Sequence, residues 1–249
     1  MWFRRVLWRL ATASELRFQP CRGEPVAART DIAFFRSSRL FEAQDLTDRP
    51  FRGSHLIRDP RDVVVSGYFY HLWTAEQWAH ESDGHSWGGL SYQQYLNSVD
   101  RRQGLLAEIE HCAGTTLADM AAWDYARPQF LELRYEEVMA DEQGQFARLF
   151  HFYGFDAEAV EVGLAAVTRV SIHSETTPDD QDQPPEATEE AQALPPTATE
   201  DAEHPRRHVR SGKSGQWRRY FDDAHVERFK ELTGDLVVRL GYESEPDWG

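Results

Sequence analysis

The stretch His55-Leu-Ile-Arg-Asp-Pro-Arg-Asp-Val-Val-Val-Ser66 decides the fold, because it predicts a strand, a turn and a helix in immediate succession. The apolar segment 55–57 predicts a strand that ends at Arg58. Asp59 is a good N-cap, and Pro60 suits the first helical position, where a missing N–H costs no hydrogen bond. Helical spacing predicts that one set of residues faces a core, namely Val63, Val64, Gly67 and Tyr70. A second set shares the adjacent face, namely Asp62, Ser66 and Phe69.

Arg58 and Ser66 are the anion-binding candidates of this stretch. Arg58 follows the predicted strand, and Ser66 lies two turns inside the predicted helix. A guanidinium and a hydroxyl beside a helix N-terminus offer charge and hydrogen bonds to a phosphate. On spacing alone, a surface arginine and a helix-interior serine explain the same pattern equally well.

The composition indicates a globular chain with an acidic bias. Its 249 residues are 41% hydrophobic and 12% aromatic, and the net charge of -15 argues against a general nucleic-acid binder. Ten acidic residues lie between Glu175 and Glu203, where there is no Lys or Arg. Without those ten charges the total of -15 becomes -5, which is ordinary for a soluble domain. A locally basic site is therefore compatible with the composition.

The cysteines and the apolar runs indicate in which cellular compartment the protein resides. Cys21 and Cys112 are the only cysteines, too few for a disulfide framework or a Cys-rich metal site, which favours a reducing compartment. No run approaches the ~18 apolar residues that a membrane span needs. Arg4, Arg5 and Arg9 interrupt any signal-peptide core, so we expect a cytoplasmic protein.

Periodicity predicts further elements along the chain. Residues 2–14 predict an amphipathic helix, packed on a sheet in preference to a membrane surface. The strand candidates are residues 16–18 and 31–35, and the helix candidates are residues 91–112, 117–125, 146–154 and 223–240. Glycines at 84–89 predict a loop. Its aromatic neighbours either line an acceptor pocket or belong to the core, namely Trp78, Trp87, Tyr92 and Tyr95.

Two later segments extend the pattern of the opening stretch. Phe130–Leu133 predicts a strand that runs into Arg-Tyr-Glu-Glu-Val at 134–138 and the start of a helix. Arg-Ser-Gly-Lys-Ser-Gly-Gln-Trp at 210–217 is a basic glycine loop. Backbone N–H groups in such a loop can converge on an anion, although a solvated turn has the same composition.

In this order, the three segments resemble the PAPS-dependent sulfotransferases. Arg-Asp-Pro-Arg-Asp-Val-Val-Val-Ser-Gly-Tyr at 58–68 is similar to the family's segment for the 3'-phosphate of 3'-phosphoadenosine 5'-phosphosulfate (PAPS). Residues 134–138 resemble its Tyr-Glu-Asp-Leu turn, and residues 210–217 its Arg-Lys-Gly-x-x-Gly-Asp-Trp loop. The resemblance covers most of residues 2–155 and 209–241. It implies sulfuryl transfer from PAPS to a hydroxyl or amine of a small molecule or glycan.

The resemblance also implies roles for individual residues. Arg58 and Ser66 would hold the 3'-phosphate, and Trp2 and Tyr135 would lie close to the adenine. The cofactor-binding residues implied in this way are Trp2, Arg58, Ser66, Tyr135, Arg210, Ser211 and Gly212. The loop at 210–217 departs from the family at two positions, with Ser211 in place of Lys and Gln216 in place of Asp.

One part of the family pattern has no counterpart in this sequence. The family's first strand and phosphate loop, Lys-x-Gly-Thr-x-Trp in pattern, bind the 5'-phosphosulfate. Gly-Lys-Ser at 212–214 lacks the earlier glycine and the preceding strand of a Walker loop. Met1-Trp2 match the end of the family's loop, so the chain resembles an N-terminally incomplete member. We expect a gap in the sheet and weaker charge stabilisation of the transferring group.

His71 is the candidate general base, which would accept the proton of the acceptor during in-line transfer. The family often uses a histidine near the strand that precedes the opening stretch, and residues 31–46 contain none. The alternative histidines are His55, His80 and His85. A histidine on an apolar helix is more often a packing residue, so that interpretation stays open.

The resemblance implies an α/β fold with a parallel sheet flanked by helices, related to P-loop NTPases and N-terminally incomplete. Residues 1–174 form the predicted core, and 175–208 an acidic, Pro-rich disordered insert. Residues 209–249 form the cofactor-closing loop and last helix of the same domain. No metal site is predicted. The alternative functions are a non-catalytic nucleotide-binding remnant and a scaffold protein with an acidic interaction tail. A kinase is disfavoured, because the sequence shows neither a Walker lysine nor a convincing Mg²⁺-binding carboxylate.

Overall fold

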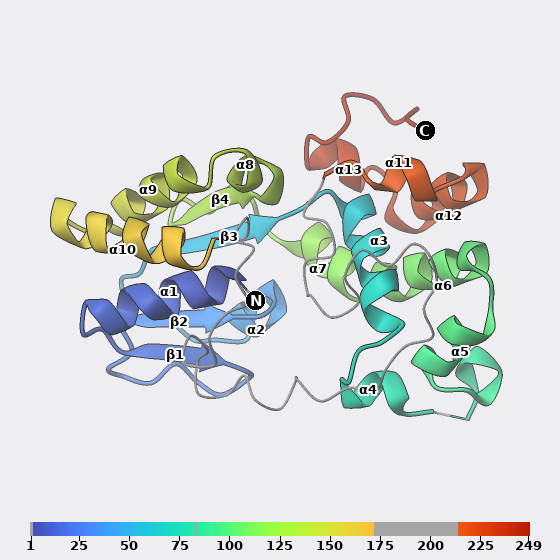
Figure 1. The fold of residues 1–249 in the computed structure, drawn as a ribbon, viewed down its shortest axis with the longest axis horizontal. Coiled ribbons are helices and arrows are strands. Elements are labelled where there is room, and N and C mark those ends of the chain that lie inside the picture. The colour runs from blue at the N-terminus through green and yellow to red at the C-terminus, as the bar shows by residue number, and fades with distance from the viewer. Residues whose placement is uncertain (1, 83, 172–213) are drawn as a thin grey trace. The chain divides into compact units, whose positions relative to one another are not determined.

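All strands in the described part of the chain pair in parallel, as predicted. The computed structural model describes residues 2–82, 84–171 and 214–249. β1 (Phe18–Cys21) pairs with β2 (Ile32–Phe35), and β3 (Gly53–Ile57) pairs with β4 (Phe130–Arg134). Within those residues the two pairs are separate sheets (Figure 1), where the sequence predicts one sheet with a gap. The α/β fold class, with parallel strands flanked by helices, is confirmed.

The chain divides into two compact units. Unit 1 contains Met1–Arg58 and Ala122–Pro185, and unit 2 contains Asp59–Ala121 and Glu186–Gly249. The division falls between Arg58 and Asp59, inside the stretch that predicts the fold. The predicted acidic insert at 175–208 lies outside the described residues.

Unit 1 combines the strands with an apolar helical layer. Its helices are α1 (Trp2–Ala13), α2 (Ser38–Glu42), α8 (Tyr135–Ala140), α9 (Glu142–Tyr153) and α10 (Ala157–Arg169). α1 packs on α10 and on the β1–β2 pair, and α10 packs on α9 (Figure 1). The buried core that they share consists of Val6, Leu7, Leu10, Leu133, Val138, Phe146, Leu149, Phe150, Val160, Val167 and Val170. The predicted packing of the first helix within a globular fold is confirmed.

The described part of unit 2 is helical. Its elements are α3 (Pro60–His71), α4 (Gln77–His80), η1 (Ser86–Gly89), α5 (Tyr92–Ser98), α6 (Arg101–Ala113), α7 (Thr116–Ala122), α11 (Trp217–Tyr220), α12 (Asp223–Thr233) and α13 (Leu236–Arg239). α6 packs on α3, α5 and α12. Among the described residues, no helix is both long and apolar enough to cross a membrane.

Several element boundaries differ from the prediction for local reasons. The predicted helix 91–112 is two helices, because Asp100 accepts a hydrogen bond from the Gln103 N–H (2.8 Å) and starts α6 afresh. The predicted helix 223–240 breaks at Gly234–Asp235 into α12 and α13. β1 begins only at Phe18, and α10 was not predicted. α9 ends as predicted at Gly154, whose φ of +88° suits a left-handed cap.

The buried face of α3 is not the predicted one. Val65 and Tyr68 are buried together with Val64, whereas Val63 and Tyr70 are only partly buried. Three consecutive valines fit two different helical stripes, so their spacing does not decide between them. The partners of α3 decide it, because the unit 2 interior also takes in two charged residues of the first turn, Arg61 and Asp62.

Candidate functional site

In unit 1, the β3–β4 pairing brings Arg58 to Tyr135. Ile57 is the register partner of Arg134, so the next residue of each strand lies at the same edge of the sheet. The Cζ atom of Arg58 lies 4.7 Å from the centroid of the Tyr135 ring. A guanidinium over an aromatic face is attracted by the ring's quadrupole. The first and second sequence segments therefore meet, and Arg58 is held beside the residue expected near the adenine.

In unit 2, Asp62 fixes the described end of the glycine loop to α3. Its Oδ2 accepts a hydrogen bond from the Gly215 N–H (2.6 Å), and its Oδ1 accepts one from the Trp217 N–H (2.9 Å). Asp62 is only 1% exposed, so both bonds are shielded from water. Gly215 has a φ of +72°, which favours glycine at this turn. The first and third sequence segments therefore also meet.

Arg61 strengthens the same attachment. Its guanidinium lies 3.9 Å from the Trp217 ring centroid and 4.6 Å from that of Trp248. It pairs with Asp59 (2.7 Å) and Glu243 (2.5 Å). Burial alone lowers the pKa of Arg61, but the two carboxylates outweigh it and raise that pKa. A buried arginine with both partners in place holds the loop, the first turn of α3 and the C-terminal segment together.

Ser66 lies on α3 in unit 2 and is partly buried. Asp62 and Ser66 are four residues apart, so they share one helix face, as predicted. The loop end that Asp62 binds is thus on the side of α3 that carries Ser66. Arg210, Ser211 and Gly212, the predicted closing residues, lie outside the described residues.

Trp2 lies in α1 and is partly buried. Its Nε1–H donates to Glu142 Oε1 (2.6 Å), and its ring meets Phe3 and Phe146 edge to face. These contacts account for the position of the indole within unit 1. The proposed place of Trp2 near the adenine stays a prediction.

His71, at the C-terminal end of α3, is paired with a buried carboxylate. Its Nδ1 lies 2.9 Å from Oε2 of Glu108, a residue of α6 with 0% exposure. The same Oε2 accepts from the Tyr92 hydroxyl (2.6 Å), and Oε1 accepts from the Cys112 thiol (3.1 Å). A base held by a carboxylate is the arrangement that general base catalysis uses. His71 is thus paired with a carboxylate, as general bases are.

The alternative histidines have other surroundings. His55 Nδ1 lies 2.9 Å from Glu132 Oε2 in unit 1, and its ring packs 4.5 Å from that of Trp123. His80 Nε2 lies 2.9 Å from the carbonyl oxygen of Thr74. His55, like His71, is therefore paired with a carboxylate, and His80 contacts a backbone carbonyl.

The aromatic residues near the 84–89 loop pack on one another, and Trp78 and Tyr92 also stack on His111. Tyr92 is buried, while Trp78 is 39% exposed. The rings of Trp87 and Tyr95 are 4.9 Å apart, and those of Trp78 and Tyr92 are 5.9 Å apart. Tyr92 thus serves the core of unit 2, and Trp78 reaches its surface.

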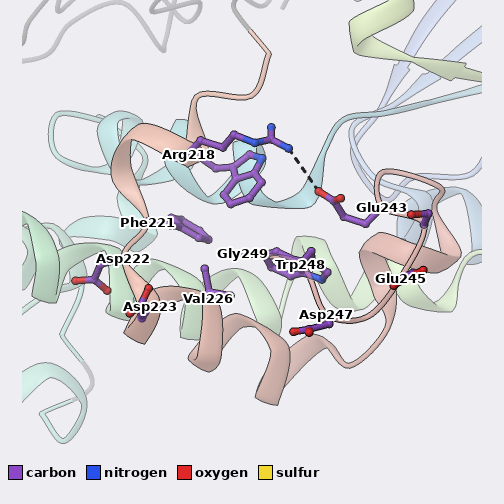
Figure 2. Close-up of a pocket in the computed structure, with 12 residues that line it drawn as sticks. Arg218, Phe221, Asp222, Asp223, Val226, Glu243, Glu245, Asp247, Trp248 and Gly249 are labelled. Atoms are coloured by element: carbon purple, nitrogen blue, oxygen red, sulfur yellow. Dashed lines mark ion pairs between the residues drawn. The ribbon is translucent and has the colours of Figure 1, made fainter.

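A pocket of about 440 Å³ lies in the C-terminal part of unit 2 (Figure 2). Its walls combine the aromatic residues Trp217, Phe221 and Trp248 with five carboxylates, namely Asp222, Asp223, Glu243, Glu245 and Asp247. Arg218 pairs with Glu243 across it (3.7 Å). So acidic a wall repels a nucleotide phosphate, and neither Arg58 nor Ser66 lines it. The pocket is not the candidate cofactor site.

Sequence reasoning missed Asp62 and Glu108 as functional residues. Asp62 was placed on the correct face, but its loop partners are 153 and 155 residues away in the chain. The residues next to Glu108 in the chain gave no sign that its side chain is buried. The only signal was Gly67 on α3, since a side chain there would put its Cβ 2.4 Å from Glu108 Oε1.

A model of a known protein family matches most of the chain. Residues 54–241 match the family model of the sulfotransferase domain, which takes in the opening stretch, the 134–138 turn and the C-terminal loop. Among solved structures, the chain is similar to mouse sulfotransferase SULT7A1 complexed with PAP, at 14% identity. That match covers 97% of this chain and 80% of the other, with a TM-score of 0.46. A search of curated proteins finds no match. Because the family model spans most of its length, the chain belongs to the sulfotransferase domain family.

Proposed function

We propose that the protein binds the 3'-phosphoadenosine end of PAPS and transfers its sulfuryl group to a hydroxyl or amine acceptor. The observation that carries this proposal is the meeting of the three sequence segments. Arg58 lies over Tyr135 in unit 1, and Asp62 binds the backbone of Gly215 and Trp217 in unit 2. Within each unit, residues separated by more than 70 positions come together, and the proposal assigns them to one phosphate-binding function.

The donors present suit the 3'-phosphate. Arg58 offers a permanent cation, and Ser66 offers a hydroxyl on the face of α3 that also holds the loop end. PAPS would supply the sulfuryl group, whose bond to the 5'-phosphate oxygen breaks as the acceptor oxygen or nitrogen bonds to sulfur. His71 would take the acceptor proton, and 3',5'-bisphosphoadenosine would leave.

A nucleotide-binding protein without transferase activity is the second candidate. It applies if the protein has no Lys-x-Gly-Thr-x-Trp loop, as none is present within residues 1–249. Charged hydrogen bonds from such a loop are worth roughly 1.5–3 kcal/mol each. Their loss at the transferring group would slow transfer far more than it weakens binding of the 3'-phosphate end.

Isothermal titration with 3',5'-bisphosphoadenosine tests the proposed cofactor. We expect measurable binding that weakens in Arg58→Ala and Ser66→Ala. Exposed residues provide matched controls, Arg148→Ala in unit 1 and Ser98→Ala in unit 2, which should bind like the wild type. A folded wild-type sample that shows no binding at millimolar nucleotide contradicts the proposal.

A sulfate-transfer assay then separates the two candidates. The protein is incubated with PAPS and a panel of phenols, alcohols and amines. Mass spectrometry should detect the added sulfuryl group (SO₃) on the acceptor if transfer occurs. Binding with no transfer to any acceptor favours the non-catalytic candidate.

Deletion of residues 176–203 tests the scaffold alternative. The deletion should leave nucleotide binding intact, whereas loss of a protein partner would favour the scaffold alternative.

A further inference from the structure

Glu108 lies in a helix that the sequence analysis treated as ordinary. In the structure its carboxylate is completely buried. Its side chain has 0% exposure, and three side chains bond to it, namely His71, Tyr92 and Cys112. A buried carboxylate is costly unless donors surround it. Such an arrangement is stable only if every partner presents a hydrogen to Glu108.

Two of the three partners are fixed as donors. Burial, reinforced by the nearby Glu108 charge, raises the pKa of the Tyr92 hydroxyl well above its ordinary value. The same two causes raise the pKa of the Cys112 thiol. Both groups therefore keep their protons and donate them, one to each oxygen of Glu108. With both oxygens already accepting, Glu108 acts as an acceptor toward His71 as well.

That acceptor role selects one tautomer of His71. The ring atom 2.9 Å from Glu108 Oε2 is Nδ1, so Nδ1 carries the hydrogen. In a neutral imidazole the other nitrogen, Nε2, then has the free electron pair. A base needs that pair in order to accept a proton.

We infer that Glu108 is a positioning residue that holds His71 as the Nδ1–H tautomer, with Nε2 as the basic atom. The inference rests on the proposed sulfuryl transfer for its catalytic meaning, but the tautomer itself is a property of the protein alone. In transfer, Nε2 would take the proton of the acceptor while Nδ1–H stays bonded to Glu108. The carboxylate would then stabilise the imidazolium that forms.

The surrounding rings hold the imidazole in place. The centroids of Trp78, His111 and Tyr92 lie 5.1, 5.5 and 5.6 Å from that of His71. Burial lowers the pKa of His111, which keeps a second cation away from His71 near neutral pH. The His71 side chain is still 12% exposed, and its neighbour Trp78 reaches the surface. The imidazole is thus held by its neighbours, and part of its surface stays exposed.

Gly67 makes the arrangement possible from α3. A Cβ at this position would lie 2.4 Å from Glu108 Oε1 and 3.7 Å from the Cys112 sulfur. Only a residue without a side chain lets α6 bring Glu108 this close to α3. Gly67 and His71 are four residues apart, so one face of α3 supplies both the space and the imidazole.

Nitrogen-15 NMR of the histidine rings tests the inference directly. Long-range ¹H–¹⁵N spectra distinguish the two neutral tautomers, and the His71 signals are assigned by their loss in His71→Gln. We expect the Nδ1–H tautomer in the wild type and a loss of that preference in Glu108→Gln. Glu110→Gln is the matched control on the same helix, because Glu110 is exposed and pairs with Arg228 instead. The control should retain the wild-type tautomer.

Kinetics provides the second readout. If the wild type transfers sulfate, Glu108→Gln should lower kcat by about a hundredfold, the lower end of what a positioned base contributes, with KM within about twofold. An Nε2–H tautomer in the wild type overturns the inference, even if Glu108→Gln fails to fold. An unchanged tautomer in folded Glu108→Gln overturns it too. A correct tautomer in a protein without transfer activity refutes the proposed function and leaves the positioning role of Glu108 intact.

Discussion

Units 1 and 2 are stabilised by different interiors. Unit 1 contains the strands of the described chain and an apolar core, and its one buried charged residue in that part is Glu142. The other buried polar or charged residues belong to unit 2, namely Asp59, Arg61, Asp62, Thr74, Ser91, Glu108 and His225. Apolar burial provides most of the free energy of folding, whereas buried polar groups demand particular partners. In unit 2, buried polar groups thus fix the positions of loops and side chains through their hydrogen bonds and ion pairs.

The largest expected contrast is between a buried and an exposed ion pair. Asp59→Ala leaves Arg61 buried without its bidentate partner and removes the N-cap of α3, so we expect a loss of about 3–5 kcal/mol in the free energy of unfolding. Asp31→Ala breaks the exposed pair with Arg17 in unit 1 and should cost much less, because solvent screens both charges. Urea denaturation measures both, and equal losses would show that the buried charges of unit 2 have no special weight.

A smaller effect is expected where α3 and α6 touch. Gly67→Ala forces a methyl group against the buried Glu108 carboxylate, and overpacking of this kind costs roughly 1–3 kcal/mol. Gly114→Ala, at the end of α6, meets no atom closer than 3.8 Å and should leave the melting temperature nearly unchanged. Helix propensity alone favours alanine at position 67. A stabilised Gly67→Ala protein would therefore contradict the close approach of the two helices.

The smallest expected effect concerns a surface group of unit 2. Partial desolvation raises the pKa of Asp222, but hydrogen bonds from Arg102 and the His225 N–H outweigh it and hold that pKa at about 2, below its ordinary 3.8. A depressed pKa contributes stability above about pH 4 that is lost as the pH falls toward 2. Asp222→Asn should therefore show a flatter dependence of unfolding on pH in this window.

Local signals made much of the fold predictable. Asp59 caps α3 and Pro60 opens it as the sequence indicates, because a cap and a first-turn proline act within a few residues. Gly154 ends α9 for the same kind of reason. The prediction of the buried face of α3 was wrong because the partners of this helix, such as Glu243 for Arg61, are distant in the sequence.

The candidate site was predictable only in part. Arg58, Ser66 and Tyr135 emerged from their residue types and order, and Arg58 does lie over Tyr135. Glu108 could not be foreseen, since a lone glutamate on a helix ordinarily faces water. Its burial depends on α3, α5 and α6 coming together, with Gly67, Tyr92 and Cys112 each contributing a contact.

The most direct test of the central claim compares two nucleotides that differ only in the 3'-phosphate. Isothermal titration of 3',5'-bisphosphoadenosine and adenosine 5'-monophosphate gives the contribution of that phosphate to binding. We predict tighter binding of the bisphosphate to the wild type, and a preference that nearly disappears in Arg58→Ala but persists in Arg148→Ala. Equal binding of both nucleotides to the folded wild type, or a preference unchanged in Arg58→Ala, would contradict the assignment of the 3'-phosphate to Arg58.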